Sequence, residues 1–192
     1  MPAVAKTSDA KVVRAARKLV EREGPALLSM QAVAAAVGVR APSLYKRFPD
    51  RESLLDAVAE EALADLRAAL VTADHAPTGS AALAAMARAY RAFAKRHPLL
   101  YGLLFAARPG RTEPTPATRA AVEPVLVRLA GLVGPEHVLT AARLLTSFLH
   151  GFVSMEIAGA FRLGGDIDDA FEFGLTTLLR ALSPDGARRR AP

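Results

Sequence analysis

The sequence contains no cysteine among its 192 residues. This absence excludes disulfide bonds, catalysis by a thiol, and metal sites built on cysteine. A chain without disulfides suits the reducing cytosol, and we therefore expect a cytoplasmic protein. The four histidines show no spacing typical of metal ligands, so we predict no metal and no cofactor.

Long hydrophobic runs are also missing. The longest, such as Leu99–Ala107, fall far below the roughly 18 residues that a membrane span needs. Residues 1–10 are polar and lack the apolar segment of a signal peptide. Hydrophobic residues nevertheless make up 52% of the chain, enough for a sizeable core. We predict a soluble protein that does not contact a membrane.

Signatures of catalysis are absent as well. The chain has no serine in a nucleophile-elbow pattern, no zinc-protease HExxH, no phosphate-binding P-loop and no GxGxxG. A catalytic helical protein is the alternative in a different class, but no motif favours it. We predict that the protein is not an enzyme.

Positive charge is present, and it is concentrated at one end. Residues 1–51 hold 10 Lys and Arg against 4 Asp and Glu, a net charge of +6. Residues 52–192 hold 15 of each and are neutral. A basic segment joined to a neutral one is typical of a nucleic-acid-binding domain with a second domain attached. Basic N-terminal arms that only solubilise a protein are the alternative.

The basic segment has the pattern of two short helices joined by a tight turn. Ser29 can cap a helix whose apolar face includes Val33 and Val37, and Gly38 suits the left-handed backbone at its end. The second helix is predicted over residues 41–48, with Pro42 in its first turn and Pro49 as its stop. This arrangement is a helix-turn-helix.

The second helix should bury two apolar side chains and expose polar ones. Leu44 and Phe48 are four residues apart and share the inner face. The outward side chains can reach base edges or phosphates in a major groove; these are Arg40, Ala41, Ser43, Tyr45, Lys46 and Arg47. Arg51, at the start of the following helix, can lie beside a phosphate. An ordinary helical hairpin with a solvated basic face is the alternative.

The segment resembles the DNA-binding domain of the TetR/AcrR family of bacterial transcriptional repressors. The matching residues are Val33-Ala34, Gly38-Val39, Ser43-Leu44-Tyr45, Phe48-Pro49, Arg51-Glu52 and Leu54-Leu55. Arg40 departs from the family pattern, since many members have a serine cap there. The resemblance also implies that the first turn of the first motif helix, with Gln31, contacts DNA. The full predicted DNA-binding set is Ser29, Gln31, Arg40, Ala41, Pro42, Ser43, Tyr45, Lys46, Arg47 and Arg51.

The rest of the chain predicts helices separated by proline or glycine, with no strand. We predict an all-α fold of about nine helices, three in the N-terminal domain and six behind it. Their predicted ranges are 9–23, 29–37, 41–48, 51–71, 81–96, 99–107, 117–133, 136–163 and 167–182. The predicted domains are a helix-turn-helix domain over 1–50, an effector-binding and dimerisation domain over 51–183, and a basic, disordered tail over 184–192.

The last two helices carry more apolar surface than one helix needs, so we predict a homodimer through a four-helix interface. A two-fold dimer would place two recognition helices about 34–36 Å apart on double-stranded DNA. A monomer core made from the same residues is the alternative. The segment from Phe148 to Phe161, with Asp166, Asp168 and Phe171, also resembles the ligand-binding domain of one TetR subgroup.

The family uses this domain to bind a small effector, which the resemblance implies here as well. Aromatic and Met side chains form adaptable apolar walls, and the predicted lining is Met86, Tyr90, Phe93, Tyr101, Leu104, Phe105, Phe148, Phe152 and Met155. Plain core packing is the alternative for most of them. Arg143 and Glu156 could orient a ligand, with a structural ion pair or an exposed position as the favoured alternative. His150 is expected to be a hydrogen-bonded core residue.

The predicted function is a ligand-responsive repressor that an apolar effector releases from a palindromic operator. An activator, or a DNA-binding protein without an effector, fits the sequence equally well.

Overall fold

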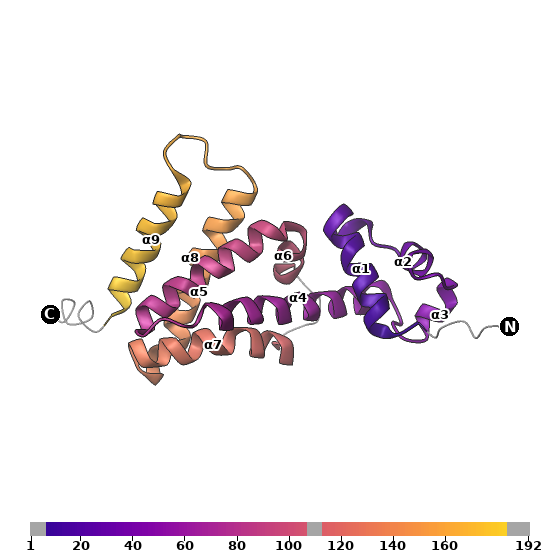
Figure 1. Cartoon of the computed structure of the whole chain (residues 1–192), viewed down its shortest axis with the longest axis horizontal. Helices are drawn as coiled ribbons and strands as arrows, with labels where there is room; N and C mark the ends of the chain where they lie inside the picture. Colours follow the sequence, from indigo (N-terminus) through magenta and orange to yellow (C-terminus); the bar gives the residue numbers. More distant parts are fainter. Residues whose placement is uncertain (1–6, 107–112, 184–192) are drawn as a thin grey trace. The chain divides into compact units, whose positions relative to one another are not determined.

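The computed structural model describes residues 7–106 and 113–183. The described residues form nine α-helices and two short 3₁₀ turns, η1 (Pro25–Leu27) and η2 (Pro135–His137). The α-helices, drawn in Figure 1, are α1 (Asp9–Glu23), α2 (Met30–Val37), α3 (Ala41–Tyr45), α4 (Arg51–Ala73), α5 (Gly79–Arg96), α6 (Pro98–Phe105), α7 (Pro116–Val133), α8 (Val138–Ile157) and α9 (Ile167–Leu182). The predicted all-α fold is confirmed, and the predicted bounds of α1 and α9 are the observed ones. The predicted tail over 184–192 lies outside the described residues.

The chain divides into two compact units, which differ from the predicted division after residue 50. The N-terminal unit comprises residues up to Leu63 together with His97–Thr112. The C-terminal unit comprises Ala64–Arg96 and the residues from Glu113 onward. Helix α4 therefore contributes to both units, and α6 belongs to the N-terminal one.

The N-terminal unit is built around the buried faces of α1, α2 and α4. Helix α1 packs against α2 and α6, and α2 packs against α3. Side chains such as Val12, Val20 and Val33 are fully buried between these helices. Burying each such side chain contributes about 1.5–3 kcal/mol, so this core can hold the short motif helices in place.

The turn between α2 and α3 follows the sequence prediction. The hydroxyl of Ser29 accepts a hydrogen bond from the backbone N–H of Ala32 at 3.1 Å and caps α2. Gly38 ends α2 with φ +73°, a left-handed conformation that costs glycine little. The helix-turn-helix therefore has the local geometry that its sequence encodes.

Helix α3 is shorter than predicted. It ends at Tyr45 rather than at residue 48, and its last hydrogen bonds run from the backbone N–H groups of Arg47 and Phe48 to the carbonyl of Leu44. Pro49 has no N–H to donate to the Tyr45 carbonyl, so no further helical hydrogen bond can follow the one from Phe48. Asp50 then caps α4 through a 2.7 Å hydrogen bond from the Ser53 backbone N–H, which holds the pKa of its carboxyl below the ordinary value.

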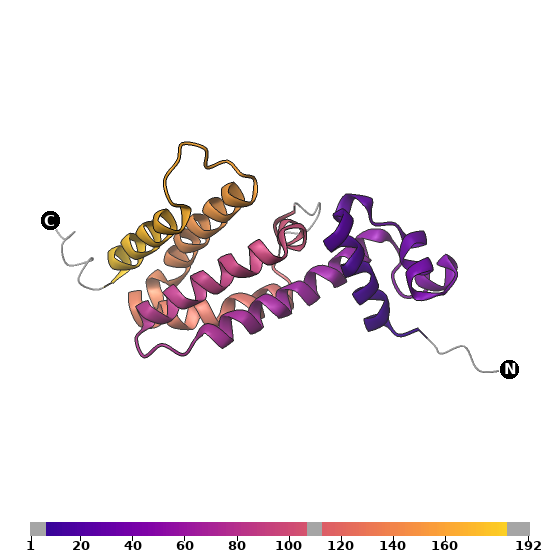
Figure 2. The same cartoon turned by 45° about the horizontal axis from the view of Figure 1, so that its top comes forward.

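The C-terminal unit is a helical bundle of α5, α7, α8 and α9 with the end of α4. Helix α5 packs against α7, α8 and α9, and α7 packs against α8. Figures 1 and 2 both show α8 and α9 side by side, joined by the loop over residues 158–166. The buried residues Leu145, Leu149, Phe171, Leu175 and Leu179 repeat at helical spacing on α8 and α9.

Helix α8 also ends earlier than predicted, at Ile157 instead of residue 163. Gly159 adopts φ +61°, and its N–H donates to the Glu156 carbonyl while the N–H of Ala160 donates to the Met155 carbonyl. These two hydrogen bonds form a Schellman motif, which terminates a helix. Phe161 therefore lies in the loop and not on the helix.

The stretch Pro135–Ile157 is long and apolar enough to cross a membrane by length and composition. The face of α8 that carries Leu145 and Leu149 packs inside the C-terminal unit. The hydropathy is high because apolar residues also occupy the exposed face, among them Leu144 and Met155.

Candidate functional site

Helix α3 presents most of the predicted DNA-binding side chains on one exposed surface. Leu44 is the anchor, because it is buried in the N-terminal unit while its neighbours are not. The exposed residues are Arg40, Pro42, Ser43, Tyr45 and Lys46, and Ala41 is half-buried. Tyr45 keeps 46% of its surface exposed, which is unusual for an aromatic residue in a small unit.

The positive charges at the two ends of α3 are not neutralised by ion pairs within the described residues. Within the described residues, no carboxylate pairs with Arg40 or Lys46. Arg40 occupies the N-cap position of α3 and makes no side-chain cap hydrogen bond. These side chains, with the hydroxyls of Ser43 and Tyr45, can donate to phosphates or base edges.

The two other predicted cations are held within the N-terminal unit. Arg47 forms an ion pair with Asp9 at the start of α1. Arg51 donates from Nε to the carbonyl of Leu28 at 2.9 Å and from Nη2 to the carbonyl of Pro25. Arg51 therefore fastens the start of α4 to the segment that precedes α2. Its predicted contact with a phosphate, like that of Arg47, stays a prediction.

The predicted residues of α2 differ in role. Gln31 is exposed in the first turn of α2, one residue after the helix begins. Ser29 is half-buried and uses its hydroxyl as the N-cap. Gln31 therefore has a side chain available to a ligand, whereas Ser29 has its hydroxyl engaged with the backbone.

The predicted effector residues of the C-terminal unit lie on α5 and α8, which pack against each other. Met86, Tyr90 and Phe93 are buried on one face of α5. On α8, Phe148 and Phe152 are half-buried and Met155 is exposed. The prediction that these side chains line one pocket stays a prediction.

The remaining three predicted effector residues lie in the N-terminal unit, on α6. Tyr101 is buried, Leu104 is half-buried and Phe105 is exposed. The rings of Tyr101 and Phe105 contact each other with centroids 5.1 Å apart. Neither compact unit on its own brings all nine predicted residues together.

Part of the predicted pocket lining forms an aromatic cluster that joins α8 to α9. The Phe171 ring, fully buried, lies with its centroid 6.0 Å from that of Phe148 and 5.2 Å from that of Phe152. The Phe161 centroid lies 4.9 Å from that of Phe152. A Cβ atom added to Gly174 would lie 2.6 Å from the Phe148 ring, so this glycine lets the ring approach α9. These contacts favour a core role for Phe148 and Phe152.

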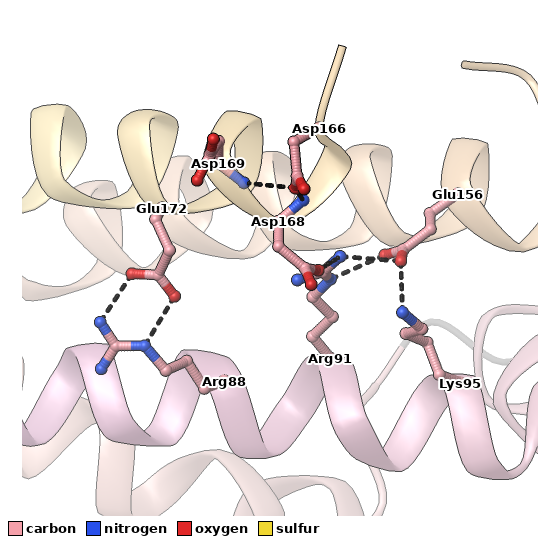
Figure 3. Close-up of polar contacts among 8 residues, drawn as sticks. All are labelled: Arg88, Arg91, Lys95, Glu156, Asp166, Asp168, Asp169 and Glu172. Carbon is pink, nitrogen blue, oxygen red and sulfur yellow. Dashed lines mark hydrogen bonds and ion pairs between the residues drawn. The ribbon is translucent and has the colours of Figure 1, made fainter. Parts of the chain in front are cut away.

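A network of ion pairs covers this cluster, and we call it the α5 network (Figure 3). Its cations project from α5 toward carboxylates at the end of α8 and the start of α9. Its members are Arg88, Arg91, Lys95, Glu156, Asp168 and Glu172. Glu156 is thus a partner in a structural ion pair, as the favoured alternative predicted, while Arg143 is exposed.

Arg91 is the centre of the α5 network. Its Nε and Nη2 atoms donate to the two carboxylate oxygens of Glu156 at 2.7 and 2.8 Å, and Nη2 lies 2.7 Å from Asp168 Oδ1. The guanidinium carbon lies 4.6 Å from the Phe171 centroid and 5.7 Å from that of Phe152. The side chains of Arg91 and Glu156 are only 11% and 9% exposed. Arg91 and then Lys95 hold the pKa of the Glu156 carboxyl below its ordinary value, against the opposing effect of burial.

The sequence interpretation missed this network. The spacing of Arg88, Arg91 and Lys95 places three cations along one side of a helix, a signal that the sequence does contain. Their partners lie more than 60 residues away in the chain, and only the packing of α8 and α9 on α5 reveals them.

An exposed, basic helix-turn-helix on one unit and a second helical unit in the same chain define a DNA-binding transcriptional regulator. Residues 12–58 match the family model described as bacterial regulatory proteins of the tetR family, and residues 83–178 match the tetracyclin repressor-like C-terminal domain. The chain belongs to the TetR family. Members of this family are not enzymes, as predicted.

Similar proteins agree with this assignment. An uncharacterised HTH-type transcriptional regulator of Mycobacterium tuberculosis, Rv0681, is 35% identical over 85% of this chain and 75% of its own. A protein of unknown function from Rhodococcus sp. RHA1 superposes with a TM-score of 0.79 at 27% identity, over 95% of this chain and 100% of its own. A TetR variant from Acinetobacter baumannii AYE, in complex with minocycline, superposes with a TM-score of 0.73 at 24% identity, over 97% of this chain and 100% of its own.

Proposed function

We propose that this regulator is a ligand-responsive repressor that binds a palindromic operator as a homodimer. The observation that carries the proposal is the surface of α3, where Arg40 and Lys46 are exposed without a carboxylate partner among the described residues. Such side chains can bind DNA without first breaking an ion pair. The proposed DNA-contacting set is the one predicted from the sequence, with Arg47 and Arg51 also having structural roles.

Exposed apolar residues on α8 and α9 support the proposed dimer. Leu144 and Met155 on α8 are 50% and 47% exposed, and Phe173 on α9 is 76% exposed. Two copies of these helices would bury this surface in a four-helix interface around a two-fold axis. The half-sites of the operator would then lie about 34–36 Å apart.

An apolar effector is proposed for the C-terminal unit, with the buried face of α5 as one of its walls. The buried residues Met86, Tyr90 and Phe93 support this proposal, and the minocycline complex shows that another protein of this fold accommodates a small molecule. The effector must bind better to a conformation with lower DNA affinity, because only a difference in affinity can release the DNA.

Selection of bound genomic DNA fragments at two salt concentrations tests the proposal. A recovered palindrome whose half-sites are one helical turn apart, with affinity that falls steeply with salt, is the expected result. Binding without any recovered sequence preference would contradict an operator-specific protein. The recovered operator in front of a reporter gene then distinguishes repressor from activator by the sign of the change in transcription.

A further inference from the structure

We propose that Arg91 is a positioning residue that fixes α9 and the end of α8, and thereby sets the surface on which the dimer forms. The inference rests on the proposed dimerisation through α8 and α9. It follows from the way in which one guanidinium joins the last turn of α8 to the first turn of α9.

The loop that leads into α9 contributes little packing. Residues 157–166 are all exposed, and glycines at 159, 164 and 165 adopt positive φ values. The Phe161 ring contacts Phe152, and Asp166 caps α9 by accepting from the N–H groups of Asp168 and Asp169 at 2.7 and 3.0 Å. The Asp166 cap orders the first turn of α9, and the Phe161–Phe152 contact joins the loop to α8.

Arg91 joins the first turn of α9 to α5 and to the last turn of α8, in addition to the packing of Phe171 and the Arg88–Glu172 pair. One guanidinium binds the last turn of α8 through Glu156 and the first turn of α9 through Asp168. The same group lies over the ring of Phe171, whose side chain is fully buried. Figure 3 shows both carboxylates converging on this one side chain. Lysine in its place could not bridge them in the same way, because its ammonium lacks the planar fork.

Arg91 sets the position of α9, and this position determines where the outer face of α9 lies. Phe171 and Leu175 are buried, whereas Phe173 between them points to the opposite side of the helix and is exposed. A shift of the inner face therefore moves Phe173 by a comparable amount. Since interface side chains interlock at native packing density, such a shift weakens association.

Helix α5 also carries the proposed effector residues. By their spacing at about 3.6 residues per turn, Met86, Tyr90 and Phe93 lie on the opposite face of α5 from Arg88, Arg91 and Lys95. If a ligand on the Met86 face displaces α5, the cations on the opposite face therefore displace the ends of α8 and α9 that they bind. Arg91 connects the proposed effector site to the proposed dimer interface.

Arg91→Met tests the proposal, with Arg88→Met as the matched control. Arg88 lies one turn away on α5 and binds the Glu172 carboxylate of α9 with two hydrogen bonds, but its pair is exposed. Sedimentation of the full-length protein over a dilution series gives the dimer dissociation constant, and hydrogen exchange of residues 158–182 reports the order of α9. Circular dichroism verifies the helical content of each variant.

We expect Arg91→Met to raise the dissociation constant by about tenfold or more and to speed exchange in α9. Arg88→Met should change the constant by less than about twofold, as for an exposed pair. If Arg91→Met fails to fold, Asp168→Asn can be measured instead. This change removes only the ion pair between Arg91 and the exposed Asp168, and it should still weaken the dimer by roughly threefold.

Three results would overturn the inference. An unchanged dissociation constant in Arg91→Met, with or without a lower melting temperature, would reduce Arg91 to a stabilising residue. An equal loss of dimer affinity in the Arg91 and Arg88 variants would show that the effect comes from removing any positive charge on α5 and not from Arg91 in particular. A wild-type protein that remains monomeric at every concentration would instead refute the proposed dimer, and the inference with it.

Discussion

Helix α3 of the N-terminal unit and helix α5 of the C-terminal unit use their cations in opposite ways. On α3, Arg40 and Lys46 are exposed and have no carboxylate partner among the described residues. On α5, the three cations of the network are all paired, and Arg91 is almost buried. We propose that the unpaired charge on α3 serves recognition, whereas the paired charge on α5 fixes one helix on another. Net charge alone does not distinguish the two uses, but the location of the carboxylates does.

The largest effect is expected from breaking the internal pair. Glu156→Gln should lower the free energy of unfolding at neutral pH by about 2 kcal/mol, because Arg91 would keep its charge in a nearly buried position with a weaker partner. Urea denaturation followed by circular dichroism measures the change. Thr146→Ala, an exposed position on the same helix, is the control and should be almost neutral.

The pH dependence of that loss sharpens the comparison. The pKa of Glu156 is lowered in the folded protein, mainly by Arg91. Its contribution to stability is therefore complete above the unfolded-state pKa, about 4.3, and disappears as the pH falls through the lower folded-state value. The stability difference between wild type and Glu156→Gln should shrink toward zero across this acidic range. A difference that stays constant down to pH 3 would contradict the ion-pair explanation.

An intermediate effect is expected at the turn of the helix-turn-helix. Gly38→Ala forces a side chain into a left-handed conformation, although the added Cβ would meet no atom within 4 Å. The cost is therefore conformational and should be about 1 kcal/mol of unfolding free energy. Thermal unfolding measures this cost. Ala35→Gly, at an exposed position on α2, is the comparison, because it destabilises the helix through its backbone without changing the turn.

The smallest effect on stability is expected at the exposed cation of α3. Lys46→Ala should change the free energy of unfolding by less than about 0.5 kcal/mol, because its charge is not used within the fold. It should nevertheless weaken binding to all DNA sequences and reduce the slope of log affinity against log salt by about 0.9. Fluorescence anisotropy with the selected operator and an unrelated duplex measures both. An unchanged salt slope would remove Lys46 from the DNA interface.

The sequence predicted the parts of the fold that depend on neighbouring residues. Ser29 and Gly38 bound α2 as expected, and the apolar spacing of α9 gave its full range. The predicted ends of α3 and α8 were wrong, because Pro49 has no N–H to continue the hydrogen bonds of α3 and Gly159 adopts a left-handed conformation inside an apolar run. The exposed surface of α3 was also predictable, since one buried residue, Leu44, sets which side chains face outward.

The partners of the cations could not be predicted from the sequence. Arg47 and Asp9 are 38 residues apart, and Arg91 and Glu156 are 65 residues apart. No local pattern encodes such pairs, because they depend on how the helices pack. The surroundings of the predicted pocket residues could not be predicted for the same reason. Aromatic spacing identified Phe148 and Phe152, but only the packing of the helices shows that Phe171 contacts Phe148 and that Arg91 lies over Phe152.

The burial of the Arg91–Glu156 pair constrains how the sequence can change over evolutionary time. A single substitution at either position leaves a nearly buried charge with only its more exposed partner, Asp168 or Lys95, so a descendant that loses one must pass through a less stable intermediate. Apolar residues at both positions together avoid that cost. Positions 91 and 156 should therefore vary together among related sequences, whereas positions 88 and 172, whose pair is open to water, should drift independently.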